Sequence, residues 1–227
     1  MTSRIISPFG VGPWSSGGAA AVGFTQSLAH FNGADGATTT TDEIGGRAWT
    51  LGTLVELDTS TQQFGTACVQ CINNNQRSIV TGLTIPVGSS FTVESFVRTN
   101  LNADFAYLDS NGDLSSMYFA AGNGSVEMFV DTTGADVLLS PVVTFTAATW
   151  YHIAIVRDVA GGVYSMYFDG NRIATVANAS NLQNAITVFH LYDSGGTGVR
   201  HDEFRVSTVA RYTGATYTIP AAEFVVD

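Results

Sequence analysis

The chain has 227 residues, of which 45% are hydrophobic and 12% are charged, and it contains 24 glycines. This length is sufficient for one β-sandwich domain with a sizeable core. The formal net charge is -10 and every basic residue is arginine. Because no basic stripe offsets repulsion from phosphates, we expect no nucleic-acid binding. No apolar stretch is long enough to span a bilayer and no secretory signal is evident, so we expect no membrane insertion.

The first 27 residues differ in composition from the rest of the chain. They combine Pro8 and Pro13 with several glycines and a short alanine run, which is typical of an arm or linker. The sequence therefore predicts an extended N-terminal arm at residues 1–27 and one domain at residues 28–227. The arm either packs on its own domain or docks into a neighbouring subunit. Docking would use its apolar side chains, Ile5, Ile6, Phe9 and Trp14.

Cys68 and Cys71 form the only C-x-x-C motif of the chain. A zinc site needs a second ligand pair, and the sequence contains no further cysteine or paired histidines to supply one. The motif also lies within an expected strand and not at a helix start, where redox pairs are found. We therefore expect two buried structural thiols and a chain that folds in a reducing cytoplasm.

From about residue 28 onward the chain reads as short strands separated by turn residues. Alternating or β-rich runs occur at 91–98, 104–108, 114–120, 125–131, 137–145, 185–192 and 199–207. The breaks between them contain Asn-Gly and Thr-Gly pairs, which favour hairpin turns. No segment longer than about ten residues has helical periodicity. The pattern predicts an all-β fold of two packed antiparallel sheets.

The stretch Trp150–Val176 specifies three consecutive antiparallel strands. Residues 150–157 alternate between two faces and are rich in β-branched and aromatic side chains. A glycine-ended loop follows, and after the second strand Asp169 and Gly170 supply the residues of a tight turn with positive φ. This stretch alone fixes the fold class as all-β.

The acidic residues do not form the carboxylate pair that a glycoside hydrolase requires. Glu127 and Asp131 share a strand face but lie about 13 Å apart, whereas the catalytic carboxylates lie about 5 to 9.5 Å apart. Glu94 has no second acid two or four residues away. Motifs for nucleophilic or zinc hydrolases are also missing from the sequence. We therefore predict that the protein is not an enzyme.

Several blocks of the sequence resemble a known family. These are, in order, HFNGADGATTTTDEIGGRAWT, FGTACVQC, FTVESFVR, WYHIAIVRD, YFDGNRIAT and DEFRVSTVARYTGATYTIPAAEF. Together they resemble the laminin G-like, concanavalin A-like jelly-roll domains of tailed-bacteriophage structural proteins. The resemblance implies an antiparallel jelly-roll sandwich that serves on particle surfaces, often as an oligomer and usually without enzymatic activity.

The resemblance also implies a possible structural calcium ion, and no other cofactor. Many relatives hold calcium between an early loop and a late acidic strand. The matching positions are Asn32, Asp35 and Asp202. The alternative is that these residues only cap turns at the edge of the sandwich.

A carbohydrate site would require aromatic platforms and a few polar groups. The candidate platforms are Tyr107, Tyr118 and Tyr192 near strand ends, and Trp49 after a glycine-rich turn. Each of them could equally be a core or rim aromatic.

The function we expect first is capsid decoration on the virion surface of a phage, after synthesis in the cytoplasm of the bacterial host. In this hypothesis the arm attaches the protein to the major capsid protein or to other virion proteins, and the protein forms a homo-oligomer. The competing hypothesis is a carbohydrate-binding adhesin module of a phage tail or fibre, whose partners are surface glycans. A third class, a glycan-cleaving enzyme, would require turnover of a polysaccharide.

Overall fold

The computed structural model describes residues 24–72, 77–100, 106–110, 117–122, 125–144, 146–193 and 198–227. All regular structure in these residues is β-strand. None of them forms a helix of the length and hydropathy that a membrane crossing requires. The candidate docking residues of the arm, Ile5, Ile6, Phe9 and Trp14, lie outside the described residues.

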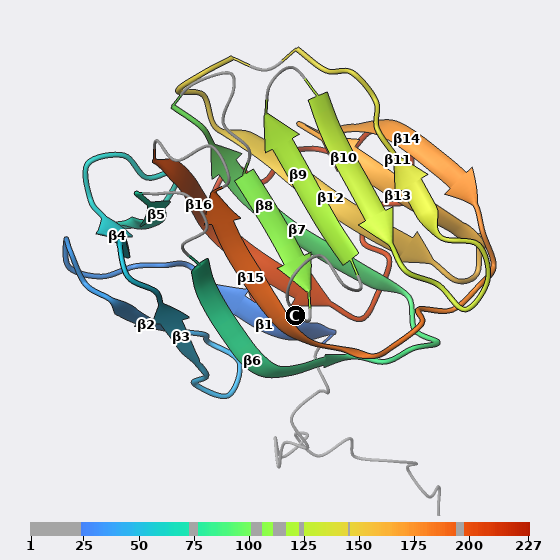
Figure 1. Ribbon diagram of the computed structural model, residues 1–227, viewed down its shortest axis with the longest axis horizontal. Helices are drawn as coiled ribbons and strands as arrows, with labels where there is room; N and C mark the ends of the chain where they lie inside the picture. The colour runs from blue at the N-terminus through green and yellow to red at the C-terminus, as the bar shows by residue number, and fades with distance from the viewer. Residues whose placement is uncertain are drawn as a thin grey trace, which may run out of the picture.

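The described strands form two antiparallel sheets of eight strands each. Sheet 1 consists of β1 (Thr25–Ala29), β4 (Val55–Asp58), β5 (Cys68–Cys71), β7 (Phe91–Arg98), β12 (Tyr151–Asp158), β13 (Val163–Phe168), β14 (Asn171–Ala177) and β16 (Val199–Ser207). Sheet 2 consists of β2 (Thr39–Thr41), β3 (Ala48–Leu51), β6 (Arg77–Ile85), β8 (Ala106–Ser110), β9 (Met117–Gly122), β10 (Ser125–Val130), β11 (Val137–Leu139) and β15 (Ile186–Asp193). In Figure 1 the yellow-green strands β8, β9 and β10 lie in front of β7 and β12.

The main hydrophobic core lies between the two sheets. Val93, Ile155 and Phe204 of sheet 1 join Leu108 and Phe119 of sheet 2 in one buried cluster. Core residues alternate with residues on the outer face in these strands, as a period of two requires, except at Glu203 in β16, where the register shifts. The predicted all-β, two-sheet antiparallel fold is therefore confirmed.

The tight turn predicted between β13 and β14 has the expected backbone. Phe168 pairs with Asn171, which leaves Asp169 and Gly170 as a two-residue loop. Their φ angles are 49° and 78°. Positive φ at both positions matches the twist of antiparallel strands, and a glycine adopts it without steric cost.

Two predicted boundaries are wrong. Residues 25–27, which the sequence assigned to the arm, belong to β1 and pair with β16. The strand predicted for residues 137–145 ends at Leu139. Pro141 follows shortly after, and a proline cannot donate a hydrogen bond to a sheet ladder.

The outer face of sheet 1 is covered by residues 208–227, which we call the C-terminal strap. Tyr167 of β13 donates hydrogen bonds to the carbonyl oxygens of Tyr212 (3.0 Å) and Gly214 (2.9 Å). Farther along the strap, Phe224 packs against Phe96 of β7, with ring centroids 5.9 Å apart. Both faces of sheet 1 are therefore buried over much of their area.

Cys68 and Cys71 are free and fully buried in β5, as expected for structural thiols. Burial is the main factor that raises the pKa of both thiols far above their usual range. Both side chains therefore stay protonated at physiological pH, and they are poor nucleophiles and poor metal ligands.

Candidate functional site

One row of side chains crosses five neighbouring strands on the outer face of sheet 2. Each member lies directly opposite the next in the antiparallel registers, and the residues beside them in sequence point into the core. We call this set the cross-strand row: Leu138, Phe129, Tyr118, Asp109 and His190.

The first half of the cross-strand row is apolar and accessible. Tyr118 and Phe129 stack with ring centroids 5.7 Å apart and an interplanar angle of 18°. Both rings are partly exposed, and Leu138 beside them is 60% exposed on the edge strand β11. A flat, solvent-accessible aromatic pair of this kind can stack against the apolar face of a ring-shaped ligand.

Polar groups flank this aromatic pair. The hydroxyl groups of Tyr118 and Ser140 both donate to the Glu127 carboxylate, the latter over 3.0 Å. On the other side, His190 Nδ1 lies 3.0 Å from Asp109 Oδ1, but both residues are buried, so the accessible polar groups are those around Glu127. The face therefore combines stacking area with hydrogen-bonding groups, and no enclosed pocket is found over the described residues. A ligand would lie across the face.

The structure places two of the four predicted carbohydrate residues, Tyr118 and Tyr192, on the outer face of sheet 2. Tyr107 and Tyr192 are opposite each other on β8 and β15, in the register next to the cross-strand row, and Tyr118 belongs to the row itself. Tyr192 is only 5% exposed, and the side chain of Tyr107 lies outside the described part. The sequence reading missed Phe129 and Leu138. Their outward positions in alternating strands were the available signal.

Trp49 requires a correction. It lies in β3 with 0% exposure, and its ring packs edge-on against Phe31 (5.0 Å between centroids) and Phe204 (5.1 Å). A ring enclosed in the core has no face for a sugar, so Trp49 is a core residue. The glycine-rich sequence before it suggested a loop, but the chain forms a strand opposite Val80.

The predicted calcium residues have separate hydrogen-bond partners. Asn32 Oδ1 accepts from the backbone and hydroxyl of Thr66, and Asp35 Oδ1 accepts from the backbone and hydroxyl of Thr59. Asp202 is fully buried and accepts three backbone hydrogen bonds, from residues 63, 64 and 203. These contacts fit capped turns, and a calcium ion at this set stays a prediction.

A different group near these residues has the composition of a metal site. His30, Glu203 and Glu223 offer ligand atoms that all lie within 4.8 Å of one another, and no other such group exists among the described residues. His30 Nδ1 lies 2.8 and 2.9 Å from the two carboxylate oxygens of Glu203, and its Nε2 lies 3.2 Å from Glu43. The hydrogen bond to Glu203, opposed by burial, is the main factor that raises the pKa of His30 to about 9. His30 is therefore a cation paired with acids at neutral pH.

This ion pair predicts a pH dependence of stability. Because the folded-state pKa of His30 is above its ordinary value of 6.5, its stabilising contribution is complete below pH 6.5 and is lost as pH rises through about 9. We expect the free energy of unfolding to fall by about 1–3 kcal/mol more in wild type than in His30→Gln over this window. Urea unfolding of both proteins at pH 6 and pH 10 measures this difference in unfolding free energy.

The difference between the two proteins is the informative quantity. Burial raises the pKa of Asp202 to about 8, so this residue titrates in the same window in both proteins. Parallel stability curves for wild type and His30→Gln would show that His30 contributes no pH-dependent stability.

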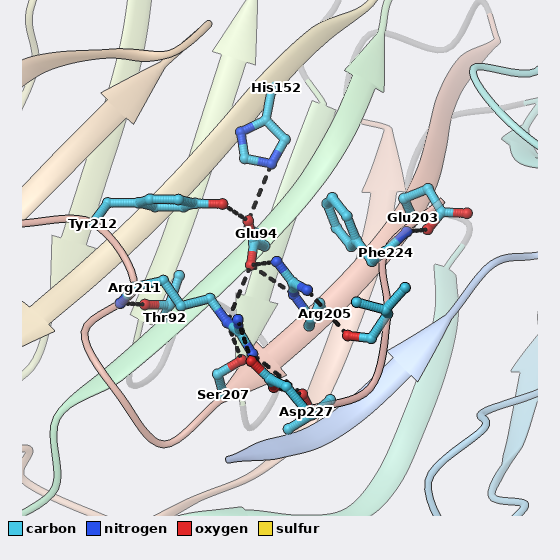
Figure 2. A network of polar contacts seen from close by, with 12 residues as sticks. Thr92, Glu94, His152, Glu203, Arg205, Ser207, Arg211, Tyr212, Phe224 and Asp227 are labelled. Atoms are coloured by element: carbon cyan, nitrogen blue, oxygen red, sulfur yellow. Dashed lines mark hydrogen bonds and ion pairs between the residues drawn. The ribbon is translucent and has the colours of Figure 1, made fainter. Parts of the chain in front are cut away.

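A second polar cluster lies between sheet 1 and the C-terminal strap (Figure 2). At its centre is Glu94, which is fully buried. Arg205 donates to Glu94 from Nε, and both Nε and Nη2 of Arg205 lie 2.8 Å from Glu94 Oε1. The other carboxylate oxygen, Oε2, accepts from the Tyr212 hydroxyl over 2.6 Å and lies 3.2 Å from His152 Nε2. Burial opposes ionisation of Glu94, but its contacts with His152 and Arg205 outweigh burial and lower its pKa to about 2.

The Glu94 cluster joins the strap to the sheet. Arg211 Nε lies 3.7 Å from Glu94, while its Nη2 pairs with Asp227 at the end of the strap over 2.5 Å. Glu94 itself comes from β7 and Arg205 from β16. Since the carboxylate is completely enclosed, no substrate can reach it, and we assign it a structural role.

The comparisons with known proteins identify the family. The family model described as the concanavalin A-like lectin/glucanases superfamily, of the laminin G type, matches residues 73–213. The chain therefore belongs to this superfamily, and the predicted laminin G-like, concanavalin A-like jelly roll is confirmed. No curated protein matches the sequence.

Similar solved structures are binding domains of bacterial toxins. The binding domain of Paraclostridial Mosquitocidal Protein 1 aligns with a TM-score of 0.61 and 15% identity, over 83% of this chain and 49% of that chain. The receptor binding domain of botulinum neurotoxin D aligns with a TM-score of 0.61 and 13% identity, over 76% of this chain and 47% of that one. The ligand binding domain of botulinum neurotoxin serotype D in complex with N-acetylneuraminic acid aligns with a TM-score of 0.57 and 16% identity, over 76% of this chain and 45% of that chain.

This chain thus spans about half the length of those neighbours. At such low identity the likeness shows the fold alone. None of these relatives is a phage protein, so the phage part of the resemblance has no support from them.

Proposed function

We propose that this protein is a non-enzymatic carbohydrate-binding module that recognises surface glycans with the outer face of sheet 2. The observation that carries the proposal is the stacked, partly exposed pair Tyr118 and Phe129, flanked by the Glu127 carboxylate. Membership of a superfamily of lectins and glucanases supports it, as do structural neighbours that are receptor and ligand binding domains.

The chemistry of the face suits a sugar ring. One side of a pyranose is lined by C–H groups and can stack on an aromatic ring, while its hydroxyl groups need hydrogen-bond partners around the edge. Tyr118 and Phe129 supply the stacking area, and Glu127 with Ser140 supplies acceptors and donors next to it. Because the face is open, the bound sugar keeps much of its surface in water, which favours modest affinity and multivalent use.

The spacing of acids on this face supports binding without cleavage. Glu127 is opposite Ala120, which is opposite Tyr107, and Asp109 lies two residues farther along that strand. Two strand spacings and two residues along the strand place the Cα atoms of Glu127 and Asp109 about 12 Å apart, and Asp109 is fully buried. Retaining and inverting glycosidases need separations of about 5 to 9.5 Å. Among the described residues of this face, these two acids therefore do not form a catalytic pair.

Replacing Phe129 with alanine is expected to weaken glycan binding by about tenfold to a hundredfold, since a central stacking contact contributes about 1.4–2.8 kcal/mol. Tyr118→Ala is expected to act similarly, whereas Tyr118→Phe keeps the ring and retains most of the affinity. A glycan array finds the ligand, and calorimetric titration of the best glycan measures the changes.

Phe24→Ala is the matched control, because Phe24 is 54% exposed and immediately precedes β1 in sheet 1. Loss of binding in Phe24→Ala together with unchanged binding in Phe129→Ala would reject sheet 2 as the binding face. An array without any signal would reject glycan binding, and polysaccharide turnover would reject the non-enzymatic part.

Decoration of a phage capsid stays a prediction from the sequence. It entails attachment to the major capsid protein, homo-oligomerisation and a location on the virion, and the matches above bear on none of these. The adhesin alternative shares its central element, glycan recognition, with the function proposed here.

A further inference from the structure

Two arginines lie opposite each other at one end of the outer face of sheet 1. Arg98 of β7 pairs in register with Arg200 of β16. Their neighbours Val97 and Val199 belong to the core between the sheets, so both arginines are on the outer face. Like charges directly opposite each other in a sheet are destabilising unless something compensates them.

Only Arg200 of the two arginines forms an ion pair with a carboxylate within the described residues. Arg200 Nε donates to Asp58 Oδ2 over 2.6 Å, while Oδ1 of the same carboxylate accepts from Ser60. Arg98 has no carboxylate partner among the described residues. Both guanidinium groups donate through Nη1 to the same amide oxygen, Asn100 Oδ1, at 3.0 Å and 3.1 Å. One neutral oxygen is therefore shared by two cations.

Arg98 also has unused hydrogen-bonding capacity. A guanidinium carries five N–H donors. The contact with Asn100 is the single hydrogen bond of the Arg98 side chain within the described part of the chain. Arg98 is partly exposed and Arg200 is 8% exposed, so a small solute can reach the first while the second is held in place. Burial and, next to it, the charge of Arg200 lower the pKa of Arg98.

Gly198 sets the local packing at this end of the sheet. Its φ is +99°, and a Cβ there would lie 2.8 Å from Asn100 Nδ2 and 3.1 Å from Gln70 Nε2. The absence of a side chain at this position lets the amide groups of Asn100 and Gln70 sit close to the arginines. Gln70 itself is directly opposite Arg200 in the register of β5 and β16. The corner is thus rich in N–H donors.

We propose that Arg98 and Arg200 form a binding site for an oxyanion, namely a carboxylate, sulfate or phosphate group. Such a group accepts two hydrogen bonds from a guanidinium fork and supplies the ion pair that Arg98 lacks within the described residues. In a chain with net charge -10, this pair is a local positive spot. The site lies on sheet 1, away from the face proposed for glycans, so the two proposals stand or fall separately.

Titration followed by NMR of the arginine Nε–Hε signals tests the proposal on the full chain. Sodium sulfate is compared with sodium chloride at matched ionic strength, so that general screening is the same in both series. We expect the Arg98 signal, assigned by its loss in Arg98→Lys, to shift saturably with sulfate and not with chloride. The melting temperature should rise with sulfate, since a ligand that binds only the folded state stabilises it.

Two further arms identify the source of the anion. Glucuronate is compared with glucose: tighter binding of glucuronate than of sulfate identifies an acidic saccharide, and the reverse order identifies an inorganic ion. Either result supports the site. Arg98→Gln should weaken binding by about tenfold or more, which corresponds to loss of a charge-assisted hydrogen-bonded contact.

Arg172→Gln is the matched control, because Arg172 of the distant strand β14 is also partly exposed and donates to the backbone carbonyl of Thr213. Three results would each overturn the proposal: an equal loss of sulfate affinity in Arg98→Gln and Arg172→Gln, equal shifts of the Arg98 signal with chloride and sulfate, or an unchanged sulfate affinity in Arg98→Gln. If Arg98→Gln fails to fold, Arg98→Lys keeps the charge but loses the fork, and a fall in affinity there gives the same answer.

Discussion

Glu94→Gln is expected to destabilise the protein by about 3–5 kcal/mol, although it changes neither the size nor the polarity of the side chain much. Arg205 is paired with Glu94 through two contacts of 2.8 Å. The substitution removes the negative charge and leaves the buried guanidinium of Arg205 without a carboxylate partner in Glu94. An unpaired charge in a fully enclosed site cannot be solvated, and this penalty dominates the effect. Urea unfolding followed by circular dichroism measures it as a lower midpoint with an unchanged slope.

Glu43→Gln is the control for this substitution. Glu43 also contacts a histidine, His30 over 3.2 Å, but its side chain is 50% exposed, and exposed pairs contribute only about 0–1 kcal/mol. The pKa of Glu94 is lowered to about 2, so its contribution is complete above pH 4.5 and is lost as pH falls through 2. The gap between wild type and Glu94→Gln should close over that range. Equal effects of the two substitutions would mean that the Glu94 cluster is not important for stability.

The strands between residues 91 and 207 were predictable from local pattern. In β7 and β12 alternate side chains face the core, and this burial is recorded directly as alternation in the sequence. In β16 a register shift at Glu203 interrupts the period between Val199 and Phe204. Turn chemistry added the boundaries, as at Asp169 and Gly170. Strands such as β2, with the sequence TTT, have too few apolar residues to show a period and were not predicted individually.

The role of Glu94 could not be read from the sequence. Alternation places it on the outer face of β7, where a carboxylate would ordinarily be solvated. Its burial depends on Tyr212, a residue 118 positions later in the chain. No local period records such a contact. The same limit applies to Trp49, whose burial depends on Phe204.

Part of the candidate glycan face was predictable for a related reason. The tyrosines of β8, β9 and β15 were chosen as aromatic residues in strands, and antiparallel pairing then brought them to one face. The pairing order of the strands was needed to show that Phe129 and Leu138 complete that face. Sequence patterns give the side of each residue within its own strand, but neighbours across strands require the topology.

The outer faces of the two sheets differ in how far they are covered. At β9, β10 and β11 sheet 2 presents partly exposed side chains there, whereas sheet 1 carries a second apolar layer that is complete only when the C-terminal strap is in place. In that layer Tyr212 and Tyr217 stack with centroids 3.8 Å apart, and Tyr217 also contacts His152 of β12 at 5.5 Å. The strap is therefore expected to be part of the folding unit.

Deleting residues 208–227 is expected to abolish folding. The strap packs four large side chains against sheet 1: Phe224 is buried, and Tyr212, Tyr217 and Ile219 are partly buried. Full burial contributes about 1.5–3 kcal/mol for each such side chain and partial burial contributes less, so their sum is still a large share of the whole stability of a domain, about 5–15 kcal/mol. The deletion also exposes Glu94 and the apolar surface around Phe96. Circular dichroism and size-exclusion chromatography should show an aggregated or unfolded product.

A point substitution measures the contribution of the strap to stability in a chain that still folds. Phe224→Ala should cost about 3–5 kcal/mol, because the ring is 4% exposed, packs on Phe96 and lies under the Arg205 guanidinium at 4.3 Å. Val226→Ala, two residues away and 47% exposed, should change the unfolding free energy by less than about 0.5 kcal/mol. A truncated chain that melts like wild type, or equal effects of these two substitutions, would show that sheet 1 folds without its cover.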